Sequence, residues 1–119
     1  MLGLASFATA ALSGPVEVYR EGKYCPRDRP PGSPAITEAQ AVERAKTLLP
    51  EGFCGPDWHV SGCDYLTEHT FDTWRVYAHQ YKDVGGRHDW GGRTHTYVIL
   101  DRVGNCLANM AGTELGGPN

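Results

Sequence analysis

The residues best suited to chemistry gather in the segment from Thr73 to Leu107. Two β-type stretches there, 73–81 and 94–101, carry arginine, tyrosine and histidine, and a glycine-rich stretch, 83–93, joins them. Histidine among such side chains can serve as a general acid or base, as a small ribonuclease-like hydrolase requires. Such catalysis needs groups within hydrogen-bond reach of one substrate atom, a condition that spacing alone does not establish.

The motifs that define common enzyme sites are missing. The chain has no Gly-x-Ser-x-Gly nucleophile elbow and no Gly-Lys-Ser/Thr phosphate loop. Its five histidines form neither His-x-x-x-His nor His-Glu-x-x-His, although His79 and His95 could converge across neighbouring strands. The sequence therefore predicts no catalytic residue, no metal site and no cofactor.

The glycine-rich stretch favours contact with a partner. Trp90 stands between two Gly-Gly pairs and is flanked by Arg87, His88 and Arg93. Tryptophan and arginine are the residue types most enriched in interface hot spots. The glycines would allow positive φ at the tip, so that the tip could enter a partner's cleft. Alternatively, Trp90 folds back onto the sheet and joins the core.

The two strands alternate between apolar and polar side chains. Trp74, Val76 and Ala78 share one face of the first strand, and Thr96, Val98 and Leu100 share one face of the second. If a helix covers these faces, the opposite side is an open face formed by Arg75, Tyr77, His79, Tyr81, His95 and Tyr97. An eleven-residue connection leaves the register between the strands undetermined. The predicted partner-binding residues are Arg75, Tyr77, His79, Tyr81, Arg87, His88, Trp90, Arg93 and His95.

One helix is clearly signalled. Thr37 and Gln40 form a Thr-x-x-Gln capping box, with Ile36 in the position of a hydrophobic staple. An apolar stripe at spacings of three and four follows, and Pro50 and Gly52 are predicted to end it. The stripe consists of Ala41, Val42, Ala45, Leu48 and Leu49. This helix should lie on the sheet.

The other strand signals are shorter. A first strand is predicted at Trp58–Val60, with a continuation at Tyr65-Leu66 after an interruption at Ser61-Gly62. A last strand is predicted at Cys106–Ala111. Val16–Tyr19 alternates and predicts a short edge strand. The order of elements predicts an α+β domain in which one amphipathic helix packs on an antiparallel meander of three to five strands.

Four cysteines, Cys25, Cys54, Cys63 and Cys106, predict two disulfides. The absence of a Cys-x-x-Cys pair argues against zinc. Three pairings are open, of which we favour Cys54–Cys63 across a Gly/Pro-rich turn, with Cys25–Cys106 tying the N-terminal arm to the last strand. The alternative is four buried free thiols in a cytosolic protein.

The ends of the chain differ in composition from its centre. Residues 1–12 carry no charge and are mostly small or apolar, which predicts a remnant signal peptide or an apolar segment packing on the domain. Residues 13–119 form a single domain, with a proline-rich extended arm at 25–35 and a loose tail at 112–119. Together with the four cysteines, the export-like start of the chain favours an oxidising location, periplasmic or secreted, over a cytoplasmic one.

Charge and hydropathy argue against nucleic-acid binding and against a membrane span. The net charge of −3 and the absence of a basic cluster argue against nucleic acid. No apolar run approaches the ~20 residues that span a bilayer, so no membrane span is predicted.

The helix, Thr-Trp-Arg-Val at 73–76, a Gly-Gly turn and Thr-Tyr-Val-Ile-Leu-Asp-Arg-Val-Gly-Asn-Cys-Leu at 96–107 together resemble the cores of cystatin-like α+β domains. The pattern covers about Ile36 to Leu107 and is similar in particular to PepSY-like domains and the small NTF2-fold immunity proteins of bacteria. Such proteins are mostly inhibitors, immunity proteins or accessory modules, and they offer no catalytic motif to carry over.

The expected function is that of a small exported binding protein, an inhibitor or immunity-type protein that neutralises a partner enzyme through the glycine-rich loop and the open face. One alternative is a small secreted hydrolase with His79 or His95 as its base. Another is a protein that binds a small ligand between the helix and a curved sheet. The partner's identity and the oligomeric state stay open.

Overall fold

The structure is a computed structural model that describes residues 24–110. The predictions for residues 1–12, for the edge strand Val16–Tyr19 and for the tail at 112–119 lie outside the described residues, as does the last residue of the predicted strand Cys106–Ala111.

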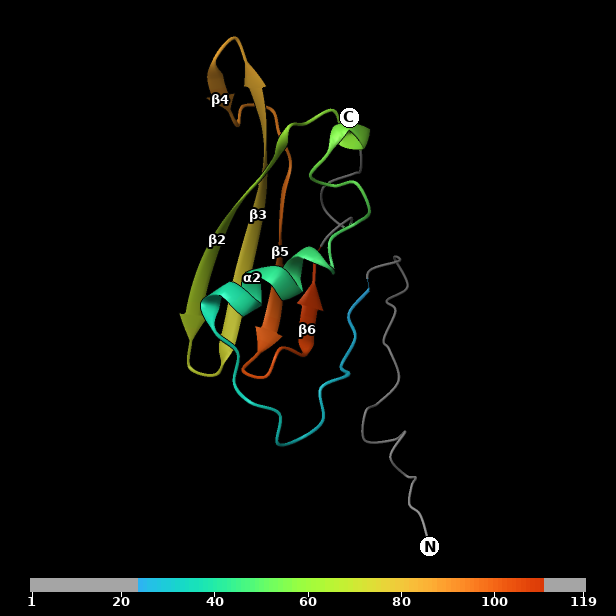
Figure 1. Cartoon of the computed structure of the whole chain (residues 1–119), viewed down its shortest axis with the longest axis vertical. Coiled ribbons are helices and arrows are strands. Elements are labelled where there is room, and N and C mark those ends of the chain that lie inside the picture. The colour runs from blue at the N-terminus through green and yellow to red at the C-terminus, as the bar shows by residue number, and fades with distance from the viewer. Residues whose placement is uncertain (1–23, 111–119) are drawn as a thin grey trace, which may run out of the picture.

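Within residues 24–110, one α-helix lies across an antiparallel sheet of five strands (Figure 1). The helix α2 spans Glu38–Lys46. The strands are β2 (Gly62–Thr70), β3 (Thr73–Val84), β4 (Arg87–Asp89), β5 (His95–Asp101) and β6 (Cys106–Asn109). They run in the order β2-β3-β5-β6, and β4 pairs with the end of β3. The predicted α+β class, with one helix on an antiparallel meander, is confirmed.

The N-terminus of α2 forms the predicted capping box. The Gln40 amide donates to Thr37 Oγ1 at 3.2 Å, and the Thr37 amide donates to Gln40 Oε1 at 2.9 Å. The helix ends at Lys46, one turn before the predicted stop at Pro50. The Thr47 hydroxyl donates to the Arg44 carbonyl at 2.7 Å, which satisfies an acceptor in the last turn.

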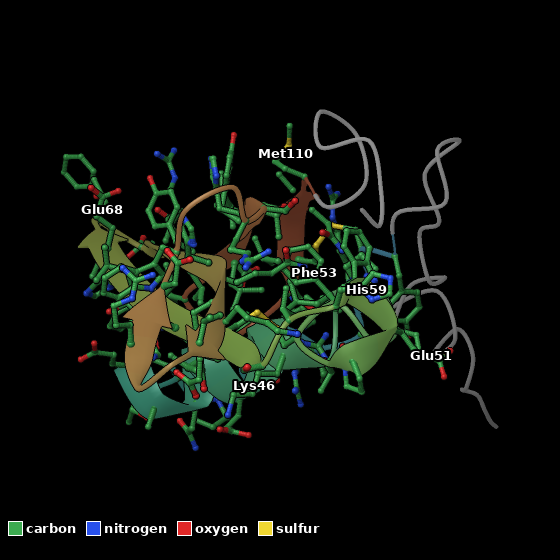
Figure 2. The ribbon with its side chains drawn as sticks, turned by 90° about the horizontal axis from the view of Figure 1, so that it is seen from above. Lys46, Glu51, Phe53, His59, Glu68 and Met110 are labelled. Carbon is green, nitrogen blue, oxygen red and sulfur yellow. A yellow bond between two sulfur atoms is a disulfide. The ribbon has the colours of Figure 1, made fainter. Side chains whose placement is uncertain are left out.

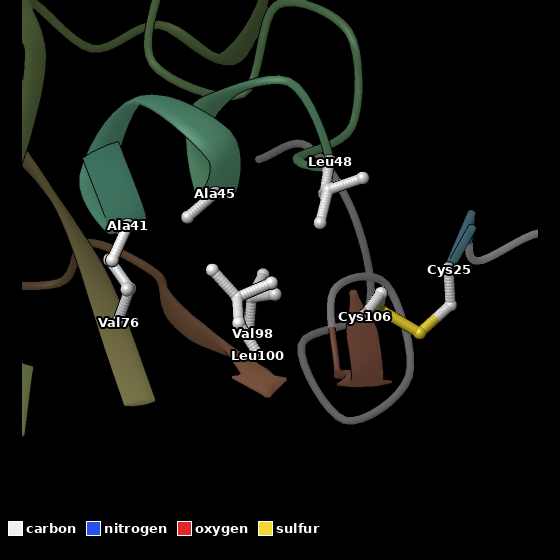
Figure 3. Close-up of a cluster of buried hydrophobic side chains, with 8 residues drawn as sticks. All are labelled: Cys25, Ala41, Ala45, Leu48, Val76, Val98, Leu100 and Cys106. Carbon is white, nitrogen blue, oxygen red and sulfur yellow. A yellow bond between two sulfur atoms is a disulfide. The ribbon is translucent and has the colours of Figure 1, made fainter. Parts of the chain in front are cut away.

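The helix covers one face of the sheet and leaves the other uncovered by helix. In Figure 2, Lys46 of α2 and Glu68 of β2 lie on opposite sides of the sheet. Two alanines of α2 pack in one core with the buried side chains of β3 and β5, and the arm and β6 close one end of this core (Figure 3). Its buried members are Cys25, Ala41, Ala45, Leu48, Val76, Val98, Leu100 and Cys106. The predicted packing of the apolar stripe on the sheet is confirmed.

The predicted strand at Trp58–Val60 is wrong. Pro56–Trp58 forms a short 3₁₀ helix, η1, which ends at His59 with a left-handed φ of 59°. Trp58 and Val60 are buried with Phe53 and Ala78 in a second core cluster. An apolar residue at every second position fits a strand, but it also fits a turn whose two apolar side chains face the same core.

Gly62 does not interrupt a strand but begins one, since β2 runs unbroken from Gly62 to Thr70. Gly62 pairs with Tyr81 of β3, and a Cβ at Gly62 would lie 2.7 Å from the Tyr81 hydroxyl. A side chain at this position would displace the Tyr81 ring, which crosses directly over the backbone of Gly62.

Both disulfides have the favoured pairing. Cys25–Cys106 joins the arm to β6, and Cys54–Cys63 joins the segment before η1 to β2. Beside the first bridge, the Cys106 amide donates to the Pro26 carbonyl at 3.0 Å. The arm is therefore attached to β6 by both a covalent bond and a backbone hydrogen bond.

The turn between β2 and β3 places an aromatic residue in an unfavourable conformation. Phe71 has a φ of 53°, and its side chain is 94% exposed. We expect Phe71→Gly to raise the free energy of unfolding by roughly 0.5–1 kcal/mol, because glycine adopts left-handed φ without strain and only part of the gain is offset by its greater freedom when unfolded. Urea denaturation measures the change.

Phe71→Ala is the matched control for this prediction. It removes the ring but keeps a Cβ at left-handed φ, so stability should change by less than about 0.5 kcal/mol. An equal gain in both variants would show that the exposed ring, and not the backbone, is unfavourable.

Candidate functional site

The face of the sheet opposite α2 carries the predicted polar side chains. The register of β3 and β5 pairs Tyr77 with Tyr97 and His79 with His95, which settles the alignment that the sequence left open. Because side chains alternate along a strand, the residues of β3 that face away from the core are Arg75, Tyr77, His79 and Tyr81. All six residues of the predicted open face lie on this side.

The side chains of the open face contact one another across the strands. The rings of Tyr77 and Tyr97 lie 5.7 Å apart, and those of His79 and His95 stack at 5.5 Å. The Arg75 guanidinium lies 5.3 Å from the centre of the Tyr97 ring, and Arg75 Nη1 donates to the Tyr77 hydroxyl at 3.3 Å. These contacts hold the side chains in defined positions.

The glycine-rich stretch is not a single long loop. β3 continues to Val84, and the chain reverses at Gly85-Gly86 into β4. Both glycines have positive φ, 58° and 81°, as a two-residue type I′ hairpin turn requires. The tip of this hairpin therefore consists of glycine, and the prediction that Trp90 forms the tip is wrong.

Trp90 folds back toward the open face without becoming core. Its indole N–H donates to Asp64 Oδ2 at 2.7 Å, and its side chain stays 50% exposed. His88 Nε2 lies 2.7 Å from the same oxygen. The His88 ring packs on the Tyr81 ring at 3.8 Å. The β3–β4 hairpin thus adds His88 and Trp90 to the open face.

Asp64 is a site residue that the sequence did not reveal. It lies on β2 opposite His79, on the same side of the sheet as the open face. The hydrogen bond from His88, together with one from Trp90, holds the pKa of the Asp64 carboxyl below its ordinary value. The alternation along Gly62–Thr70 could have placed Asp64 on this face, had that stretch been recognised as one strand.

Two predicted site residues are not brought into this group. Arg87 pairs with Val84, so alternation along the hairpin places it on the opposite side from His88. Arg93 closes the next turn by donating its amide to the Trp90 carbonyl at 3.1 Å. The Arg93 side chain is half-buried, and its Nε has no hydrogen-bond partner among the described residues.

The open face also includes an apolar residue. Leu66 of β2 pairs with Tyr77 and is 71% exposed. With Trp90 near one end of the face, it adds apolar contact area to the polar side chains of β3 and β5.

One hollow lies away from the open face. About 650 Å³ in volume, it lies beside α2, between the helix, the arm and the β5–β6 turn, and is lined in part by Arg29, Ile36, Gln40 and Arg44. The space between α2 and the sheet is filled by the core side chains.

No helix in the described part of the chain is long and apolar enough to cross a membrane. Among residues 24–110, no group of three or more histidine, cysteine or acidic side chains is arranged to hold a metal ion.

No family model matches this chain, and no curated protein or solved structure matches it either. The function is therefore inferred from the contacts and the exposure of the open face.

Proposed function

We propose that this protein is a small exported binding protein, of the inhibitor or immunity type, that neutralises a partner enzyme by covering it with the open face. The observation that carries this proposal is a sheet face, not covered by α2, on which tyrosine, histidine, arginine and tryptophan side chains are ordered by mutual contacts. A fold of the cystatin-like or NTF2-like kind is part of the proposal.

The composition of the open face supports binding. Tyrosine, tryptophan and arginine dominate interface hot spots, because they combine a large apolar area with hydrogen-bonding groups. The side chains of Arg75 and Tyr77 are already hydrogen-bonded to each other. They would therefore lose less conformational entropy on binding a partner than freely rotating side chains would. Leu66, exposed between polar neighbours, would contribute apolar area that is buried only in a complex.

The two disulfides support export. Structural disulfides form and persist in oxidising compartments and are rare in the cytosol. Two bridges in a chain of 119 residues are typical of a periplasmic or secreted protein.

One observation favours a second candidate, a small secreted hydrolase of the ribonuclease-like kind. His79 Nδ1 lies 2.8 Å from the Gln80 carbonyl, which can only accept, so Nδ1 carries the proton in the neutral ring. Nε2 is then unprotonated and could act as a general base, next to His95.

Open-face variants test the binding proposal. We expect Tyr77→Ala and Trp90→Ala each to weaken binding of the partner by about 30-fold, the effect of losing a hot spot worth about 2 kcal/mol. The partner would be captured from the host with the tagged wild-type protein and identified, and titration calorimetry with the purified pair measures the affinity. Inhibition of the partner's activity should weaken in parallel.

The control is Glu43→Ala on α2, on the opposite side of the sheet, where the carboxylate forms a surface ion pair with Lys46. It should leave the affinity within about twofold, because an exposed ion pair contributes little. If no partner is captured and His79→Ala abolishes a hydrolytic activity of the isolated protein, the protein is an enzyme and the binding proposal is wrong.

A further inference from the structure

His88 is held between two carboxylates. Its Nε2 lies 2.7 Å from Asp64 Oδ2 on β2, and its Nδ1 lies 3.1 Å from Asp83 Oδ1 on β3. A carboxylate oxygen can only accept, so both ring nitrogens donate and the ring in this arrangement is the protonated imidazolium. We call these three residues the His88 clamp.

The clamp joins three strands at the end of the open face. The pairing of β3 with β4 consists of three residue pairs, and Asp83 with His88 is the central one. Trp90 donates to the same Asp64 oxygen as His88, so the positions of the two side chains are coupled. A hairpin this short needs side-chain contacts to stay in place.

The other titratable groups near His88 do not replace either carboxylate. On β3, the Tyr81 ring lies under His88, and Lys82 projects to the opposite side of the strand. On β4, Arg87 and Asp89 flank His88 in sequence and also project to the opposite side. His79, further along β3 on the same face, pairs with Asp64 of β2 and with His95 of β5.

Loss of one proton disrupts this arrangement. A neutral imidazole has a single N–H, so the other ring nitrogen presents a lone pair to a carboxylate oxygen. The contact with Asp83 is the longer one, and we expect it to break first, which separates the central pair of the hairpin.

We propose that the His88 clamp is a proton-operated switch that holds β4 and Trp90 against the open face while His88 is charged and releases them when it is neutral. That the switch regulates binding rests on the proposed binding function, because release of the hairpin would change the surface that contacts the partner. The switch itself is a property of the isolated protein.

The direction of the pH dependence follows from the two carboxylates. Hydrogen bonds to Asp64 and then to Asp83 raise the pKa of His88 above its ordinary 6.5. The stability that comes from charging His88 is therefore complete below pH 6.5 and is lost as the pH rises through the raised pKa of His88. Because the pKa of Asp64 is lowered by His88, the clamp is also lost in acid, as the pH falls through that pKa.

NMR titration of the whole protein tests the switch. We expect the His88 ring to titrate above pH 6.5, and the Trp90 indole N–H and the amides of β4 to shift with the same midpoint. Asp83→Asn should lower the His88 midpoint, because a neutral amide no longer stabilises the charged ring. His88→Gln should remove the shared transition, since glutamine does not titrate.

His95→Gln is the matched control, because it removes a histidine of the open face that has no part in the clamp. It should leave the midpoint of Trp90 unchanged. A His88 midpoint at or below 6.5, or a Trp90 signal that does not follow His88, would overturn the proposal. No partner is needed for these measurements, so their outcome is independent of whether the open-face variants weaken binding.

Discussion

Replacing Cys25 and Cys106 together by alanine is expected to lower the free energy of unfolding by about 4.5 kcal/mol. The bridge closes a chain segment with a sequence separation of 81 residues, so it removes a large part of the unfolded chain's freedom. It also attaches the arm that covers one end of the main core, where both cysteines are fully buried. Denaturant unfolding under oxidising conditions measures the loss.

The second bridge provides the control. Cys54–Cys63 closes a segment with a sequence separation of only 9 residues, so the double alanine variant should lose about 2.5 kcal/mol. Equal losses in the two variants would contradict the dependence on loop length and would show that local packing around the sulfurs determines the effect.

Gln80→Met is expected to lower the free energy of unfolding by about 3 kcal/mol, because it leaves two backbone groups without partners. Gln80 is fully buried in β3. Its Nε2 donates to the Phe53 carbonyl at 2.7 Å, and its Oε1 accepts from the Thr94 amide at 3.0 Å. Methionine fills nearly the same volume, so the loss reports on hydrogen bonds and not on a cavity.

Thr96→Val is the control for this prediction. Thr96 is also buried on the core side of the sheet, but its hydroxyl has no hydrogen-bond partner among the described residues. Valine should therefore be neutral or stabilising by about 1 kcal/mol, because no hydrogen bond is lost. Thermal unfolding of both variants measures the two changes in stability. A loss in Thr96→Val as large as that in Gln80→Met would show that the loss does not come from the hydrogen bonds of Gln80.

The parts of the fold that the sequence predicted well depend on neighbours along the chain. The capping box joins Thr37 to Gln40, three residues apart, and the apolar stripe of α2 follows from the helical period. The alternation in β3 placed Arg75, Tyr77 and His79 on one face correctly, because the period of a strand is independent of its partners.

The errors arose where a local pattern had more than one structural solution. Trp58–Val60 has the alternation of a strand, but Pro56 and the nearby Cys54–Cys63 bridge favour a short helical turn. The glycines of the stretch 83–93 are compatible with either a loose loop or a hairpin. Pairing of Asp83 with His88 selects the hairpin.

By itself, the sequence determined the fold class and the side of the sheet on which each β3 side chain lies, because these depend on residue type and period. The structure selected Cys25–Cys106 and Cys54–Cys63 from the three pairings that the sequence left open. Only the tertiary structure decided which groups meet in the His88 clamp. Asp64 and His88 are 24 positions apart, and their contact depends on the register of β2 with β3 and on the turn at Gly85-Gly86. Register is a cooperative result of packing the whole sheet, so no local signal near Asp64 could specify its partner.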